Sequence, residues 1–161
     1  MAIFAIKTAR DIQAKAQEDI QLLLEKIDDS GRAMNAILSA YHLHEWIWAQ
    51  WLKAEAPKKF NGALIRDKKD FLAWLDVTCP HFELLQELAN GSKHCIPVHS
   101  TQEIAGYGRG PYGIGPYGAP YLLIDKGSSL PIAERWLVAS EMLAAIGAYW
   151  TKFFFDHGPI P

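Results

Sequence analysis

The sequence predicts a mainly α-helical single domain over residues 1–161, a bundle of about five helices with a small Gly-rich β-hairpin inserted at 95–127, before the last helix. Three observations support this fold class. Apolar residues recur three and four positions apart through most of the chain, which is the spacing of one helix face. Glycine, proline and tyrosine concentrate at 106–118, where that spacing stops. The length suits one domain with its own hydrophobic core, so folding requires neither a disulfide nor a metal.

The first predicted helix covers residues 8–28. Its apolar residues lie four, four, three and four positions apart and therefore share one helix face: Ile12, Ala16, Ile20, Leu23 and Ile27. The polar stretch 28–31 then ends the pattern. Asp29 or Ser30 is suited to cap the next helix, because short polar side chains accept hydrogen bonds from the free amides of a first turn.

The second predicted helix, 32–53, is more deeply buried, because apolar residues cover more than half of its circumference. They are Met34, Ile37, Ala40, Tyr41, Ile47, Trp48, Trp51 and Leu52. Two residues depart from this division, since Trp46 lies in the polar stripe and His44 in the apolar face. We expect His44 to be a hydrogen-bonded histidine of the core, because buried polar groups nearly always have partners.

The middle of the chain is predicted to hold a loop at 54–68 and a short helix at 70–77. Pro80 then starts a fourth helix, because proline suits a first helical position. This helix is predicted to run to about Asn90, with Gly91 as a left-handed stop.

The last third combines two strands with a final helix. Strand candidates 96–104 and 121–125 flank the Gly-rich segment. The final helix is predicted at 131–156, with one apolar stripe made of Ile132, Trp136, Leu143, Ile146, Trp150 and Phe154.

Charge and composition exclude several classes of function. The net charge is -2 and the pI is about 6.3, which argues against a duplex-DNA binder, since such proteins usually have a basic excess. No apolar run approaches the ~20 residues of a membrane span, and no signal peptide is evident, so we expect a cytoplasmic protein. Cys79 and Cys95 are expected to be buried thiols. We expect no metal and no cofactor.

The first candidate site is a polar line on the second predicted helix, formed by His42, Glu45 and Trp46 together with Asn35 and Ser39. A histidine three residues before a glutamate can share a proton with it. The alternative is a solvated helix face. Trp46 argues against that alternative, because a tryptophan in water is unfavourable unless a ligand, a partner or another element covers it.

Two further candidate sites follow in the chain. Asn90, Lys93 and His94 gather hydrogen-bond donors that suit an anion, although a plain helix terminus would look the same. Tyr112 and Tyr117, in two copies of Gly-Pro-Tyr-Gly, can stack on bases or sugars. Tyr107, Tyr121 and Arg109 lie close by in the sequence. The alternative is a Gly-rich turn segment, in which Gly and Pro serve only the backbone.

The Asn90-x3-His94 spacing at the end of a mid-chain helix resembles the HEPN superfamily of helical domains. That resemblance implies a helical bundle, often dimeric, and in many members a metal-independent ribonuclease with an Arg-Asn-x3-His motif. It would make His94 a general acid or base oriented by Asn90. The arginine of the motif falls on Ala89, so the cation that would stabilise the phosphorane is absent at that position. The chain also resembles a group of small uncharacterised bacterial proteins.

These observations favour a non-catalytic interaction or binding module that forms a homodimer. Six Trp, six Tyr and seven Phe are many rings for one small domain, and some are expected at an interface. The alternatives are a HEPN-like ribonuclease that uses His94 on RNA, or a small-ligand pocket between the second and fourth predicted helices, lined by His42, Trp46 and His94.

Overall fold

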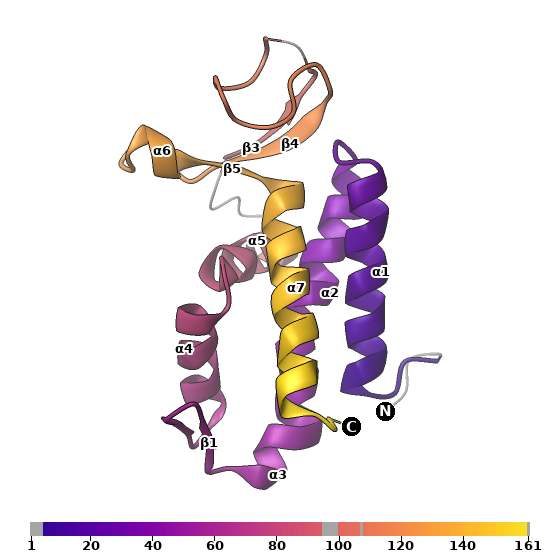
Figure 1. The fold of residues 1–161 in the computed structure, drawn as a ribbon, viewed down its shortest axis with the longest axis vertical. Helices are drawn as coiled ribbons and strands as arrows, with labels where there is room; N and C mark the ends of the chain where they lie inside the picture. Colours follow the sequence, from indigo (N-terminus) through magenta and orange to yellow (C-terminus); the bar gives the residue numbers. More distant parts are fainter. Residues whose placement is uncertain (1–4, 95–99, 107, 161) are drawn as a thin grey trace.

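The computed structural model describes residues 5–94, 100–106 and 108–160, and it confirms a mainly helical protein. Its longer helices are α1 (Ala9–Glu25), α2 (Ser30–Ile47), α4 (Lys68–Thr78), α5 (Phe82–His94) and α7 (Ala139–His157). In Figure 1, α7 runs through the centre of the molecule with α1 and α4 on opposite sides. A small β-sheet lies at one end, and the two ends of the chain lie toward the other.

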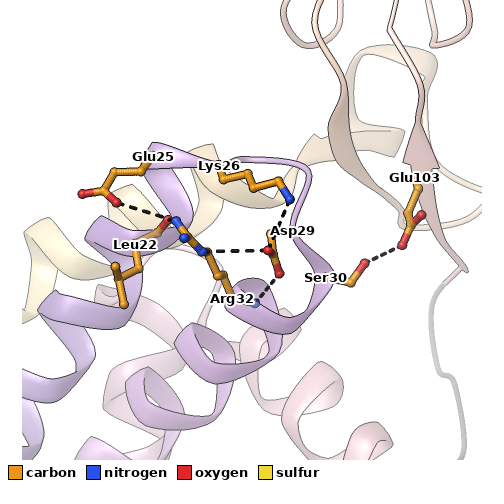
Figure 2. Close-up of polar contacts among 7 residues, drawn as sticks. All are labelled: Leu22, Glu25, Lys26, Asp29, Ser30, Arg32 and Glu103. Atoms are coloured by element: carbon orange, nitrogen blue, oxygen red, sulfur yellow. Dashed lines mark hydrogen bonds and ion pairs between the residues drawn. The ribbon is translucent and has the colours of Figure 1, made fainter.

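Local hydrogen bonds explain where α1 and α2 begin. Thr8 and Asp11 form a capping box, in which each side chain accepts a hydrogen bond from the other residue's backbone N–H. Asp29 caps α2 by accepting from the N–H of Arg32 at 3.0 Å. Figure 2 shows Arg32 reaching back across the turn, where its guanidinium contacts Glu25 and the carbonyl of Leu22. The turn between these two helices is therefore fixed from both sides.

The segment 48–68 differs from the sequence prediction. The second helix does not continue regularly to residue 53, because a π-helix (Trp48–Leu52) and the short α3 (Lys53–Glu55) follow α2. Part of the predicted loop is an antiparallel hairpin of β1 (Lys58–Phe60) and β2 (Ala63–Ile65). Its two turn residues, Asn61 and Gly62, have φ of +46° and +89°, the values of a tight hairpin turn.

A three-stranded antiparallel sheet, in the order β3-β4-β5, lies at the end of the molecule opposite the termini. β4 (Tyr121–Asp125) has the predicted bounds. β3 is described from Ser100 to Ile104, and the predicted positions 96–99 lie outside the described residues. β3 and β4 pair across the Gly-rich segment.

The third strand corrects the predicted final helix at 131–156. That stretch holds α6 (Ile132–Arg135), β5 (Trp136–Val138) and only then α7. Trp136 therefore pairs in the sheet, and Ile132 is 82% exposed, so neither belongs to a helix stripe in the core. The run Trp-Leu-Val suits a strand. Arg135 fixes its start with two hydrogen bonds to Asp125 at 2.6 and 2.7 Å.

The strand β4 is buried on both faces. Leu122 and Ile124 belong to the main core with the helices. Tyr121 and Leu123 face the other way, into a second, smaller apolar cluster that Ile104 helps to form. An uninterrupted apolar strand is what such two-sided burial requires.

The Gly-rich segment packs on the ring of Tyr121. The Tyr121 hydroxyl donates to the carbonyl of Ile114 at 2.8 Å. A Cβ added at Gly110 would lie 1.9 Å from that hydroxyl oxygen, and one at Gly115 would lie 2.5 Å from the ring. At these two positions glycine is required by space, so the repeated glycines serve the packing of a buried tyrosine.

A cluster of aromatic rings packs toward the other end of the molecule. Trp51, Phe60, Phe71, Trp74 and Phe153 form a chain of ring contacts with centroids 5.2–6.4 Å apart. Edge-to-face and offset rings are the favoured arrangements. The packing of these rings in the core therefore explains much of the chain's aromatic content.

The helix α5 extends past the predicted stop at Asn90-Gly91 and ends at His94. In its last turns, the Ser92 hydroxyl donates to the carbonyl of Ala89 at 2.8 Å, a bond compatible with continued helix. In the part of the chain that the structure describes, no helix is both long and apolar enough to cross a membrane.

Candidate functional site

A cavity of about 650 Å³ lies between the helices and the sheet. Apolar side chains line it on the helix side and on the sheet side. The helices contribute Ala33, Met34, Ile37 and Leu88, and the sheet contributes Leu122 and Ile124. Ligand pockets typically have volumes of about 300–1,000 Å³ and are lined mainly by apolar groups, so the size and lining suit a small apolar molecule.

Polar side chains also line this cavity. They are Ser30, Glu87, Ser92, Thr101, Gln102 and Glu103. Glu103 and Thr101 sit opposite Leu122 and Ile124 in the strand register, so they share the face that is turned to the helices. Ser30 Oγ donates to Glu103 Oε1 at 2.6 Å, which joins the start of α2 to β3 across the space between them (Figure 2).

A groove of about 360 Å³ adjoins the cavity, because Met34 and Ser92 line both. One wall is the α2 face of Met34, Leu38, Tyr41 and His42, and the other is the end of α5 with Ala89, Asn90 and Ser92. Two sequence-predicted site residues, His42 and Asn90, are thereby brought to the same groove from different helices. The second and fourth predicted helices do face each other there.

His42 is held by a polar relay. Its Nδ1 lies 2.9 Å from Oε2 of Glu45, and Oε1 of Glu45 lies 3.3 Å from Nζ of Lys68 at the start of α4. Burial alone would raise the pKa of Glu45, but hydrogen bonds from His42 and Lys68 and the charge of Lys68 outweigh it and lower that pKa. The carboxylate thus stays ionised and orients the imidazole.

The two residues that departed from the helix pattern are both packed against the core. His44 is 1% exposed, and its Nδ1 hydrogen-bonds the carbonyl of Tyr41. Its ring meets Phe82 edge-on at 5.6 Å. Burial lowers the pKa of His44 to about 4, so it is a neutral core histidine as expected. Trp46 is half-buried against the main core and is not among the residues that line either the cavity or the groove.

The Asn90–His94 segment is only partly placed. Asn90 is half-buried in the groove wall. Lys93 and His94 are the last residues of α5, and their side chains lie outside the described part of the structure. Ala89, which takes the place of the arginine in the HEPN motif, is 2% exposed. Its side chain is packed in the core and contributes no charge to this end of the helix.

The tyrosines of the Gly-rich segment lie apart from both hollows. Tyr112 and Tyr117 are strongly exposed and line neither the cavity nor the groove. Tyr121 is buried, so it is not available to stack on a base or sugar. Tyr107 lies outside the described residues. The exposed pair therefore forms a separate surface feature at the sheet end.

Among the described residues, no cysteine lines the cavity or the groove. Cys79 is a buried thiol whose pKa burial raises to about 12, with the charge of Asp76 adding to the effect. Cys95 lies outside the described residues. Within the described ranges, no group of three or more His, Cys, Asp or Glu side chains is placed to hold a metal ion.

The sheet side of the cavity was not predicted from the residue spacing. The run Tyr121–Ile124 carried the available signal, because four buried residues in a row need cover on both faces of a strand. Met34 was assigned to the core, yet it is 42% exposed at the junction of cavity and groove. Which helices cover the sheet depends on tertiary packing that residue spacing does not encode.

No protein-family model, no curated protein and no solved structure matches the chain. The site therefore has to be interpreted from its own geometry.

Proposed function

We propose that the protein is a non-catalytic binding module that holds a small, largely apolar ligand in the cavity between α2, α5 and the β3-β4-β5 sheet. The observation that carries the proposal is the cavity itself, about 650 Å³ in volume with apolar walls from two helices and a sheet. Removing apolar surface from water stabilises a complex by roughly 25 cal/mol per Å², so an apolar guest gains from entering it.

The polar groups support binding more than catalysis. Glu103 is engaged by Ser30, and Glu45 by His42 and Lys68. The Ser92 hydroxyl donates to a backbone carbonyl of its own helix. A small number of placed polar groups around an apolar interior is the usual arrangement by which a binding site orients its ligand.

A titration with Nile red, an uncharged apolar dye whose fluorescence rises when it leaves water, tests the proposal. We expect saturable binding of one dye per chain. Thr101→Trp should abolish dye binding, because Thr101 is exposed on the cavity face of β3 and the indole ring of a tryptophan there would occupy the cavity. Val77→Trp, at an exposed position of α4 outside both hollows, is the matched control and should bind as the native chain does. Absence of saturable binding, or equal loss in both variants, refutes the proposal.

The homodimer stays a prediction. The rings that suggested it, such as Trp51 and Phe153, pack inside the core, which removes part of the reason for it. Tyr112, Tyr117 and Phe155 are exposed aromatic side chains that an interface between two copies would use. Light scattering coupled to size exclusion measures the mass directly, and a monomer at high micromolar concentration would rule the dimer out.

The HEPN-like ribonuclease also stays a prediction. It requires His94 to transfer a proton at a ribose hydroxyl and another cation to replace the missing arginine. Cleavage of single-stranded RNA by the native chain that is lost in His94→Ala would support it. No cleavage by the native chain would end it.

A further inference from the structure

We infer that the ligand is an uncharged amphiphile, whose apolar part fills the cavity while a hydroxyl-type donor at its polar end binds Nε2 of His42 in the groove. This inference rests on the proposed function and names the chemical class of its ligand.

The hydrogen bond to Glu45 decides which ring nitrogen of His42 is available. An ionised carboxylate can only accept, so the nitrogen 2.9 Å from Glu45 Oε2 must carry the hydrogen and donate it. That nitrogen is Nδ1. In the neutral imidazole the other nitrogen, Nε2, is then an acceptor. Lys68 of α4 keeps the carboxylate in place at 3.3 Å, so the tautomer is fixed by three side chains from two helices.

The position of His42 connects this acceptor to the cavity. His42 lines the groove, and the groove meets the cavity at Met34 and Ser92. Across the groove stands Asn90, whose amide can both donate and accept. A ligand hydroxyl between these side chains can donate to His42 Nε2 and accept from Asn90, while its chain passes Met34 into the apolar interior.

The charges around the two hollows select against an ionic head group. Glu87 and Glu103 line the cavity, so a carboxylate ligand meets two like charges there. Among the described residues that line either hollow, none is Lys or Arg. In the groove a cationic head group gains little in exchange for its lost hydration, because Glu45, the carboxylate bonded to His42, is already paired with Lys68.

Four ligands with similar chains separate these possibilities. Decanol and its isomer methyl nonyl ether differ in the ability to donate, and decanoate and decylamine carry opposite charges. Binding is measured by displacement of Nile red at one fixed pH, the same for all four ligands. We expect decanol to bind about tenfold more tightly than the ether, the effect of one hydrogen bond. Decanoate and decylamine should both bind more weakly than decanol.

Variants of the groove residues test whether the preference for decanol over the ether arises there. His42→Phe should remove the preference for decanol over the ether, and a circular dichroism spectrum like that of the native chain shows that the variant is folded. Glu45→Ala removes the acceptor that fixes the tautomer of His42, so the preference for decanol over the ether should decrease only in part. Asn90→Ala should weaken decanol binding, whereas Asn35→Ala, on the exposed part of α2 outside both hollows, should not.

Failure of this inference is distinct from failure of the proposed function. If the native chain binds the ether as well as decanol, or an ion more tightly, or if His42→Phe keeps the preference, the inference is wrong while the cavity remains a binding site. If Nile red itself does not bind, the proposed function fails and takes the inference with it; if Nile red binds but none of the four ligands displaces it, the inference alone is wrong.

Discussion

Gly115 and Gly113 have the same backbone φ but different surroundings, and this allows the packing of the Gly-rich segment to be measured. Both have φ of +75°. A Cβ at Gly115 would lie 2.5–2.8 Å from three ring carbons of Tyr121, whereas nothing lies within 4 Å of a Cβ at Gly113. Gly113→Ala is therefore the matched control for Gly115→Ala.

The expected magnitudes follow from these distances. Alanine in a left-handed conformation costs about 1–2 kcal/mol, and both variants should lose that much free energy of unfolding. Forcing an extra carbon into packed surroundings costs a further ~1–3 kcal/mol, which applies to Gly115→Ala alone. For a chain of this size each kcal/mol lowers Tm by about 2–4 °C, so the two variants should differ by roughly 2–12 °C.

A third variant identifies the atom responsible. A Cβ at Gly110, whose φ lies outside the left-handed region, would lie 1.9 Å from the Tyr121 hydroxyl oxygen, and without that oxygen its nearest neighbour would be Cζ at 3.0 Å. Tyr121→Phe should therefore restore much of the stability lost in Gly110→Ala, and it should restore none of that lost in Gly115→Ala, where the ring carbons are in the way.

Thermal unfolding followed by circular dichroism, with the double variants included, measures these couplings. Equal Tm values for Gly113→Ala and Gly115→Ala would refute the argument that the glycines are selected by the Tyr121 ring. Failure of Tyr121→Phe to rescue Gly110→Ala would refute the assignment to the hydroxyl.

Three further predictions concern the helical part. His44 has a pKa of about 4 in the folded chain and 6.5 when exposed, so the unfolded chain binds one more proton between these values. The free energy of unfolding should therefore fall as the pH drops from 6.5 toward 4, by about 3 kcal/mol in all. Denaturant titrations should show a weaker pH dependence of this free energy in His44→Leu, and the same pH dependence in both chains would contradict the burial argument. Thr8→Ala removes the capping hydroxyl of α1 and should cost about 1 kcal/mol, seen as a Tm decrease of about 2–4 °C, and an unchanged Tm would mean that the cap is not stabilising. Phe71→Ala should lower the free energy of unfolding by about 3–5 kcal/mol in denaturant titrations, because the ring is fully buried. Phe155→Ala, at an 88% exposed position of α7, should change it by no more than about 0.5 kcal/mol. Similar losses in the two variants would show that Phe155 is covered in solution.

Elements with strong local signals were predictable from the sequence. The apolar spacing of α1 and the polar residues before α2 led to helices close to those observed, and Asp29, one of the two cap residues predicted for α2, is the cap in the structure. The hairpin of β1 and β2 also had a clear signal, the pair Asn61-Gly62, which was attributed to a loop because the flanking strands have three residues each.

Features that depend on tertiary contacts were not predictable in the same way. Trp136 fits a helical stripe by spacing, but its segment gains more by pairing with β4 and by the Arg135–Asp125 ion pair. His42 and Glu45 were identified as a pair from their spacing. The sequence could not identify Lys68 as their third member or Asn90 as the residue across the groove, because both depend on how α4 and α5 pack against α2.

The two-sided burial of β4 has a consequence for how the molecule opens. Its backbone amides lie between two apolar clusters, so they can exchange hydrogen with solvent only when both clusters separate from the strand. The helical core and the sheet end therefore cannot melt independently, and β4 amides should exchange at the rate of global unfolding. Amides of exposed turns in the Gly-rich segment need no such event. The protein thus combines one cooperative folding unit with a fast-exchanging surface segment held to it through Tyr121.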